Sequence, residues 1–253
     1  MKDALLGAAI AAATLVGGAY IPCTAAHADI ATPDYVSKAV ADTTRPKDDR
    51  DADAIRAPAE TLTFAGVKPG MVVGELYPCG GYFSRMIADV VGPTGKDYGL
   101  ETTRWKGCAE ADQKVIDEGH KNFSFVAAPF GEFSLPEKVD LFWITQNYHD
   151  LHIKEYGNVD MAAFNRKVFD ALKPGGVYFI LDHQAVGTLT DDAIAKVHRI
   201  AKAQLIAEVE AAGFRLAGEG TFLHRDGDDH TKSIFDKDIR GKTDQYALKF
   251  VKP

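Results

Sequence analysis

The sequence has few basic residues and no long basic run. Its 29 Lys and Arg residues are outnumbered by 36 Asp and Glu residues, which gives a formal net charge of −7 at pH 7. Basic residues never cluster beyond an adjacent pair, so the electrostatic signature of a DNA- or RNA-binding surface is missing. We therefore expect a small-molecule substrate and no nucleic-acid partner, and the composition leaves the oligomeric state open.

A hydrophobic run long enough to cross a membrane is also missing. The apolar stretch from Ala4 to Ala19 falls short of the roughly 20 residues that a spanning helix needs. It is followed by Ala26-His27-Ala28, a pattern typical of a signal-peptide cleavage site. We expect residues 1–28 to be a secretory signal, the mature chain to be periplasmic or secreted, and no stable membrane anchor to remain after cleavage.

Cysteine is scarce, with three residues in the chain. Cys23 would leave with the signal, so the mature protein would retain Cys79 and Cys108. Two cysteines in an oxidising compartment are typical of a disulfide, whereas two small apolar side chains buried separately are the alternative. The composition alone leaves both interpretations open.

What the sequence does contain is a regular alternation of strand-like and helix-like segments. An acid-rich lead-in at 29–57, with at most one short helix, precedes a helix that begins near Pro58 and ends near Gly66. The helical segments that follow include a longest one at 191–212. We predict strands at 71–76, 96–101, 123–128, 138–145, 177–182, 214–220 and 243–251.

This alternation defines the fold class. Near-continuous apolar strands separated by helices predict a mostly parallel sheet covered on both faces, so residues 58–253 should form one doubly wound α/β domain. The long polar stretch at 222–243 predicts that the last two strands form an antiparallel pair at one edge.

Titratable residues and a glycine turn come directly after the predicted strands, where ligands bind in an open α/β sheet. The turn "GELYPCGGYF" at 74–83 follows the first strand, and Glu101 ends the second. "TQNYHDLH" at 145–152 follows the fourth strand, and Asp182 and His183 end the fifth. These groups should therefore meet on one rim of the sheet.

With these motifs the chain resembles the class I S-adenosylmethionine-dependent methyltransferases from about Pro58 to Pro253. It is most similar to a branch of exported bacterial proteins that share the "GGYF" turn, "NYHDLH", "LDH" and "RGKTDQY". The resemblance implies a seven-stranded Rossmann-like sheet with an antiparallel last strand, S-adenosyl-L-methionine as cofactor, and methyl transfer to a small-molecule acceptor. It also implies that the cofactor is bound by Glu75, Tyr77, Gly80, Gly81 and Glu101.

The chemistry of Glu101 agrees with this role, because a carboxylate at a strand tip can accept two hydrogen bonds from the ribose hydroxyls. The glycine turn departs from the family pattern, since Tyr77 and Cys79 stand where two glycines are expected. The cofactor has no phosphate, so the demand for glycine is weaker, and Tyr77 could stack on its sulfonium. The alternative is a non-catalytic exported binding protein that kept the fold and has a degenerate, disulfide-strapped cofactor loop.

The histidines of the rim admit three interpretations. As acid/base groups, His149 would be the base, with Asp182 and Tyr148 completing the catalytic set. As metal ligands, His149, His152 and Asp182 match no specific zinc spacing, so we predict no metal. A structural or substrate-shaping role comes first for His152.

Two further groups receive the simpler interpretation. His198 lies beside the apolar face of the predicted 191–212 helix and should be a satisfied, partly buried side chain. The acidic residues of "HRDGDDH" lack the spacing of a calcium loop and should be solvated; they are Asp226, Asp228 and Asp229.

The proposed sheet also bears on the two cysteines. If the first two strands are neighbours, the loop with Cys79 and the segment with Cys108 share one rim, within reach of a disulfide. Such a bond would strap the pocket mouth between the glycine turn and Glu101.

Overall fold

The computed structural model describes residues 31–253, so the predicted secretory signal and Cys23 lie outside the described residues. The first described segment differs from the expected lead-in, because it forms α1 (Asp34–Val40), α2 (Lys47–Asp51) and α3 (Asp53–Arg56) instead of at most one helix. Val36 of α1 is fully buried against α5, and Asp53 binds both Arg45 and the Tyr82 hydroxyl. These contacts join the segment to the main domain, which the residue composition did not reveal.

The predicted seven-stranded sheet is confirmed, with the order β3-β2-β1-β4-β5-β7-β6. The neighbours from β3 to β5 are parallel, and β7 runs antiparallel to both β5 and β6. The antiparallel pair at one edge is therefore also confirmed. The strands are β1 (Val72–Leu76), β2 (Lys96–Thr102), β3 (Phe123–Ala128), β4 (Val139–Thr145), β5 (Leu172–His183), β6 (Arg215–Gly220) and β7 (Gln245–Val251).

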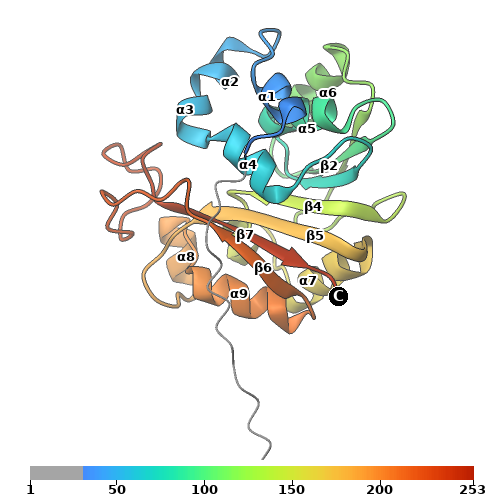
Figure 1. Ribbon diagram of the computed structural model, residues 1–253. Coiled ribbons are helices and arrows are strands. Elements are labelled where there is room, and N and C mark those ends of the chain that lie inside the picture. Colours follow the sequence, from blue (N-terminus) through green and yellow to red (C-terminus); the bar gives the residue numbers. More distant parts are fainter. Residues whose placement is uncertain (1–30) are drawn as a thin grey trace, which may run out of the picture.

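Helices cover both faces of the sheet, as expected for a doubly wound α/β fold (Figure 1). On one face α4 (Pro58–Ala65) and α5 (Tyr82–Val91) pack with α1 over a core that includes Met86 and Trp143. On the other face α7 (Met161–Ala171), α8 (Asp191–Val197) and α9 (Lys202–Ala211) pack over Tyr178 and Leu205. The remaining helices are α6 (Cys108–Asp117), beside β2 and β3, and the 3-10 turn η1 (His149–His152).

The long helix predicted at 191–212 is wrong, because the chain breaks between α8 and α9. His198 adopts a left-handed conformation with φ of 53°, and the next residue, Arg199, is fully buried. Arg199 donates to Gln184 O and Lys232 O and pairs with Asp228, so these non-local contacts determine where the helix ends. A helical repeat of apolar residues does not reveal such a break, because Ile194 before it and Leu205 after it are both buried.

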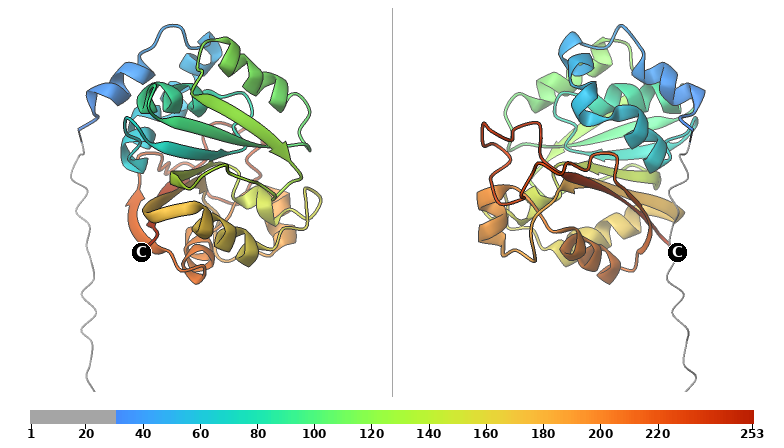
Figure 2. Two further views of the ribbon diagram at one scale, coloured as in Figure 1. Left: turned by 90° about the vertical axis from the view of Figure 1, so that its right-hand side faces the viewer. Right: turned by 60° about the vertical axis from the view of Figure 1, so that its left-hand side comes forward.

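The 222–243 loop lies beyond the carboxyl end of β5, between α8 and the N-terminal helices (Figure 2). Arg225 of this loop donates to Ile55 O, which ties it to α3. Asp226 is solvated as predicted, but the same expectation for Asp228 is wrong, since Asp228 is buried and paired with Arg199. The loop is thus fixed by a buried ion pair.

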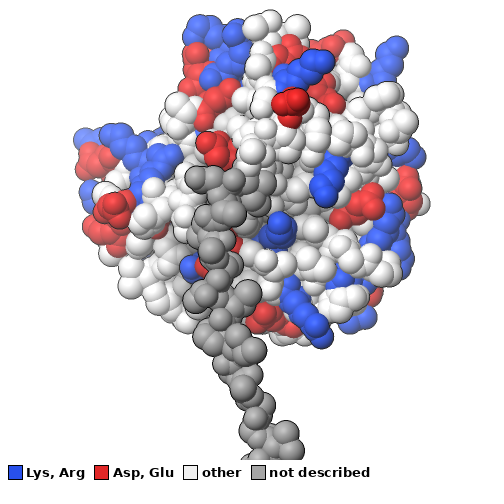
Figure 3. All heavy atoms as spheres, viewed as in Figure 1, with Lys and Arg blue, Asp and Glu red and all other residues white. Residues whose placement is uncertain are grey.

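Within residues 31–253, no helix combines the length and the apolar character that crossing a membrane requires. On the face drawn in Figure 3, Lys and Arg are interspersed with Asp and Glu, and no continuous basic patch is visible on the described surface.

Candidate functional site

A cavity of about 550 Å³ opens at the carboxyl ends of β1, β4 and β5. This is the switch point of the sheet, where the chain proceeds to β2 on one side of β1 and to β4 on the other, and where ligands bind in such folds. The lining side chains include Glu75, Tyr77, Asn147, His149, Asp150, Tyr156, His183 and His198. A larger hollow of about 730 Å³ lies at the opposite ends of β2 and β3 and contains none of these groups.

The turn after β1 keeps the left-handed conformations of a glycine turn although two of its positions carry side chains. Tyr77 has φ of 53° and Cys79 has φ of 23°, in a region that normally favours glycine. Hydrogen bonds hold the strained backbone: Tyr77 N donates to Leu100 O, Cys79 N to Glu101 and Gly80 N to Asp112. The backbone donors of the turn are therefore engaged with neighbouring groups of the protein.

The two glycines of the turn have different surroundings. A Cβ added at Gly81 would lie 2.2 Å from Val115 Cγ2, so Gly81 allows α5 to approach α6. A Cβ added at Gly80 meets nothing within 4 Å, and Gly80 lines the cavity. Close approach of a ligand is thus possible at Gly80, whereas Gly81 has a packing role.

The Tyr77 side chain forms one wall of the cavity. Its ring stacks on Phe130 at 5.0 Å between centroids and contacts the edge of Trp105, which in turn contacts Tyr156. Its hydroxyl accepts a hydrogen bond from Gly131 N. The ring is therefore fixed in an aromatic cluster, and it lines the cavity.

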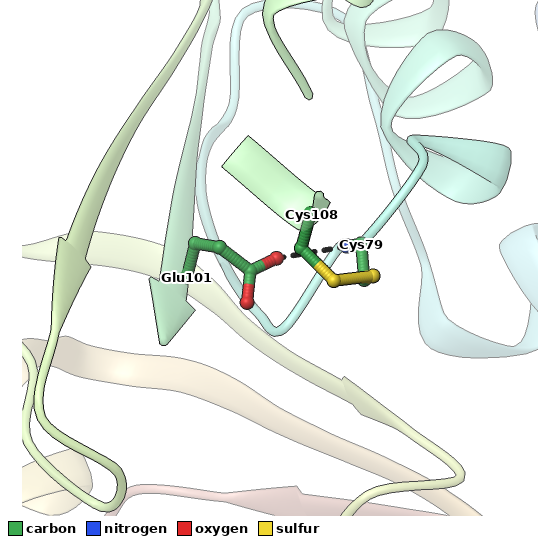
Figure 4. A group of neighbouring side chains, drawn as sticks. All are labelled: Cys79, Glu101 and Cys108. Atoms are coloured by element: carbon green, nitrogen blue, oxygen red, sulfur yellow. Dashed lines mark hydrogen bonds between the residues drawn. A yellow bond between two sulfur atoms is a disulfide. The ribbon is translucent and has the colours of Figure 1, made fainter. Parts of the chain in front are cut away.

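The predicted disulfide between Cys79 and Cys108 is confirmed, with 4.4 Å between the Cα atoms (Figure 4). Glu101 lies beside it and is 1% exposed. One carboxylate oxygen accepts from Cys79 N at 3.1 Å and the other from Thr102 N at 2.6 Å. Glu101 does not line the cavity. The carboxylate predicted to bind ribose is instead hydrogen-bonded to the disulfide-bonded turn.

Four buried carboxyl groups come from β1, β2 and α6: Glu75, Asp97, Glu101 and Asp112. Burial, reinforced by Asp112 and Glu101, raises the pKa of Glu75 to about 8, while the Ser84 hydroxyl donates to it. Burial and Asp112 raise the pKa of Glu101 to about 7. Burial and then Glu75 raise the pKa of Asp97 well above its ordinary value. The cluster is therefore protonated in part at neutral pH.

Replacing Glu75 by glutamine should flatten the pH dependence of stability. Glutamate titrates near 4.3 in an unfolded chain and Glu75 near 8 in the folded one, so the stability provided by the protonated group is present at acidic pH and lost as the pH rises through 8. We expect the free energy of unfolding of the wild type to fall by about 2 kcal/mol more than that of Glu75→Gln between pH 6 and pH 8.

Urea unfolding of the disulfide-bonded chain at several pH values measures this difference. Glu137→Gln is the control, because that carboxylate lies at the surface beside Lys96 and should leave the pH dependence unchanged in this range. Parallel curves for Glu75→Gln and the wild type would show that Glu75 is ionised throughout.

His149 lies between two carboxylates and is 1% exposed. Its Nδ1 is 2.6 Å from Asp182 Oδ1, and its Nε2 is 3.2 Å from Asp150 Oδ1. Burial alone would lower the pKa of His149, but the charges of Asp182 and Asp150 outweigh it and raise the pKa to about 10. A ring with this raised pKa would have to lose a proton before it could act as the base, and that role of His149 stays a prediction. Asp182, fully buried behind the ring, orients it.

The structure separates the other predicted groups of the rim. His183 lines the cavity with Nδ1 2.9 Å from the Thr243 hydroxyl, and burial lowers its pKa to about 3, so it is neutral. Tyr148 is fully buried, with its hydroxyl bound to Glu208 and Asn165, and this structural position replaces the predicted catalytic one. His152 also bonds Glu208, consistent with the structural role expected for it.

Two cavity residues were missed or underrated. His198 is partly buried and hydrogen-bonded, as expected, but it faces the cavity with Nδ1 3.2 Å from Asp150 Oδ1. Its position depends on the break between α8 and α9, for which the sequence carries no local signal. Trp105 lines the cavity through the aromatic cluster, and no motif marks it.

Comparisons with known proteins identify the fold. Neither a protein-family model nor a curated protein sequence matches the chain. Among solved structures, it is similar to an S-adenosylmethionine-dependent methyltransferase from Aquifex aeolicus, with 17% identity, 80% of this chain and 99% of that chain covered, and a TM-score of 0.55.

Two further structures were solved with ligands. Aeropyrum pernix fibrillarin with natively bound S-adenosyl-L-methionine is 17% identical, covers 79% of this chain and 76% of its own, and has a TM-score of 0.53. A glycopeptide N-methyltransferase in complex with sinefungin is 15% identical, covers 80% and 86% respectively, and has a TM-score of 0.54. At these identities the likeness establishes the fold: the chain has the Rossmann-like fold of the class I methyltransferases.

Proposed function

We propose that this chain is an S-adenosylmethionine-dependent methyltransferase that acts on a small-molecule acceptor. The observation that carries the proposal is the cavity at the switch point, which joins the turn after β1 to the polar residues after β4 and β5. Its volume of about 550 Å³ lies within the range of small-molecule sites. The likeness to methyltransferases, some with S-adenosylmethionine or an analogue bound, supports the same assignment.

The lining of the cavity suits a cationic cofactor. Asp49 brings a carboxylate to one side, next to the largely protonated carboxyl group of Glu75, and the aromatic faces of Tyr77 and Trp105 form another side. A sulfonium is attracted by both carboxylates and aromatic rings. When bound, the cofactor would supply the methyl group, and Gly80 would allow its close approach to the backbone.

The acceptor would bind beside the residues that follow β4 and β5. Asn147, Tyr156 and His183 offer hydrogen-bonding groups on that side of the cavity. The neutral imidazole of His183 can accept a hydrogen bond from an acceptor hydroxyl or amine, and Asp150 disfavours anionic acceptors. The main contribution of the protein to the reaction would be to orient the cofactor and the acceptor for in-line transfer.

Isothermal titration of the signal-free chain with S-adenosylmethionine and its demethylated product tests the proposal. Thr145 lines this cavity at the end of β4, and Ser124 lines the opposite hollow. We expect Thr145→Phe to weaken cofactor binding at least about 10-fold by filling the cavity, and the matched Ser124→Phe to leave it unchanged. Heat of binding should be measured in both the oxidised and the reduced protein.

Absence of binding to either form at millimolar concentration would overturn the proposal. It would favour the alternative of an exported binding protein that kept the fold without the cofactor. The observation in favour of that alternative is Glu101, whose two oxygens already accept backbone hydrogen bonds beside the disulfide. Export itself is part of the proposal and is supported by a disulfide, which is typical of oxidising compartments.

A further inference from the structure

Three potential metal ligands converge at one end of the cavity. His149 Nε2 and His198 Nδ1 each lie 3.2 Å from the same oxygen, Asp150 Oδ1. The donor atoms of the three residues all lie within 4.8 Å of one another. Two imidazoles and one carboxylate at such separations match the ligand sets of protein-bound transition metals.

Neighbouring residues orient two of these ligands. Asp182 is fully buried, and its Oδ1 lies 2.6 Å from His149 Nδ1. A proton on Nδ1 directed at that carboxylate leaves Nε2 as the nitrogen that faces Asp150. Asn147 donates to Asp150 Oδ2 at 3.0 Å, so Oδ1 is the oxygen directed at both histidines. Such carboxylate–histidine–metal and ligand–amide arrangements are typical of metal sites.

The third ligand is placed by an unusual feature of the backbone. His198 has a left-handed φ of 53° at the break between α8 and α9. The next residue, Arg199, forms a buried ion pair with Asp228, and this pair stabilises the break. In the predicted continuous helix, His198 would have a helical backbone. The buried Arg199–Asp228 pair and the left-handed backbone of His198 instead bring this imidazole to Asp150.

We propose that His149, Asp150 and His198 bind one divalent transition-metal ion at the acceptor end of the cavity. Imidazole nitrogen with a single carboxylate suits zinc, iron, cobalt or manganese better than magnesium or calcium. All three ligands line the cavity, so further coordination positions would face a bound molecule. This site goes beyond methyl transfer and is independent of cofactor binding.

The test uses the untagged signal-free chain after treatment with a chelator. When Zn²⁺ is added back, we expect the chain to retain one equivalent through gel filtration. When Co²⁺ is added instead, we expect a visible spectrum typical of mixed nitrogen and oxygen ligation. His198→Asn keeps a residue that tolerates a left-handed backbone and should weaken Zn²⁺ binding by more than about 100-fold, as should Asp150→Asn. Asp182→Asn removes only the orienting carboxylate and should weaken binding by about 10–100-fold.

His224→Ala is the matched control, because this imidazole is exposed in the 222–243 loop and should contribute nothing to the site. Circular dichroism and thermal unfolding of each variant establish that it is folded. If His198→Asn is unfolded, Asp150→Asn carries the comparison, and the cobalt spectrum of the wild type reports the ligands directly. Failure of the wild type to retain Zn²⁺, or retention by folded His198→Asn with unchanged affinity, would overturn the site. Neither result bears on whether S-adenosylmethionine binds.

Discussion

Replacing Arg199 by methionine is expected to lower the free energy of unfolding by about 3–5 kcal/mol, since it leaves a buried carboxylate without its partner. Arg199 is fully buried, and its guanidinium pairs with Asp228 through two hydrogen bonds of 2.8 and 3.1 Å. It also donates to Gln184 O and Lys232 O. All of these interactions are lost in the variant, and Asp228 is too enclosed to be solvated without movement of the loop.

Urea unfolding at neutral pH measures the loss, with Arg215→Met as control because Arg215 is exposed on the edge strand β6 and should change stability by less than about 0.5 kcal/mol. Arg199 fixes Lys232 and Asp228 of the 222–243 loop, so we also expect faster proteolysis within that loop in Arg199→Met. A change in stability below about 1 kcal/mol would mean that the pair is solvated in the native ensemble.

The fold could be predicted from the sequence because its main determinants are local. Apolar strands, such as the one around the buried Val73, alternate with amphipathic helices along the chain. Gly66 ends α4 in the left-handed conformation expected of a helix C-terminus. Three features that the pattern missed depend on distant partners: the burial of Val36, the helix break at His198, and the buried Asp228. Tertiary contacts override local propensity at each of these places.

The candidate site was predicted in its location but less well in its chemistry. The carboxyl ends of the strands bring Tyr77, His149 and His183 to one cavity, as topology requires, whereas Glu101 and Tyr148 do not line it. Their roles depend on distances of a few ångströms, which the sequence does not contain. His149 is a plausible base by residue type, yet Asp182 and Asp150 together hold it protonated. Glu101 is at the predicted position, yet one of its oxygens accepts from Cys79 N and the other from Thr102 N.

Removing the disulfide by the double substitution Cys79→Ser and Cys108→Ser is expected to have two opposite effects. The bond joins residues separated by 29 positions, and a loop of that size corresponds to a stabilisation on the order of 3–4 kcal/mol through the entropy of the unfolded chain. The free energy of unfolding should fall by that amount. Cofactor affinity should rise at least about 10-fold, because a turn no longer bonded to α6 can withdraw Cys79 N from Glu101 and free an oxygen for ribose hydroxyls.

Urea unfolding and titration with S-adenosylmethionine separate the two effects. Reductant should reproduce both in the wild type and neither in the double variant, which is the control for non-specific effects of the reagent. Glu101→Gln in the serine background should then cancel the gain in affinity, because a neutral amide accepts hydrogen bonds from the ribose hydroxyls more weakly than a carboxylate. Equal affinity of oxidised and reduced wild type would show that Glu101 does not contact the cofactor and that the disulfide has a purely stabilising role. A gain that survives Glu101→Gln would place the effect in the width of the cavity mouth, where Cys79 and Tyr77 lie.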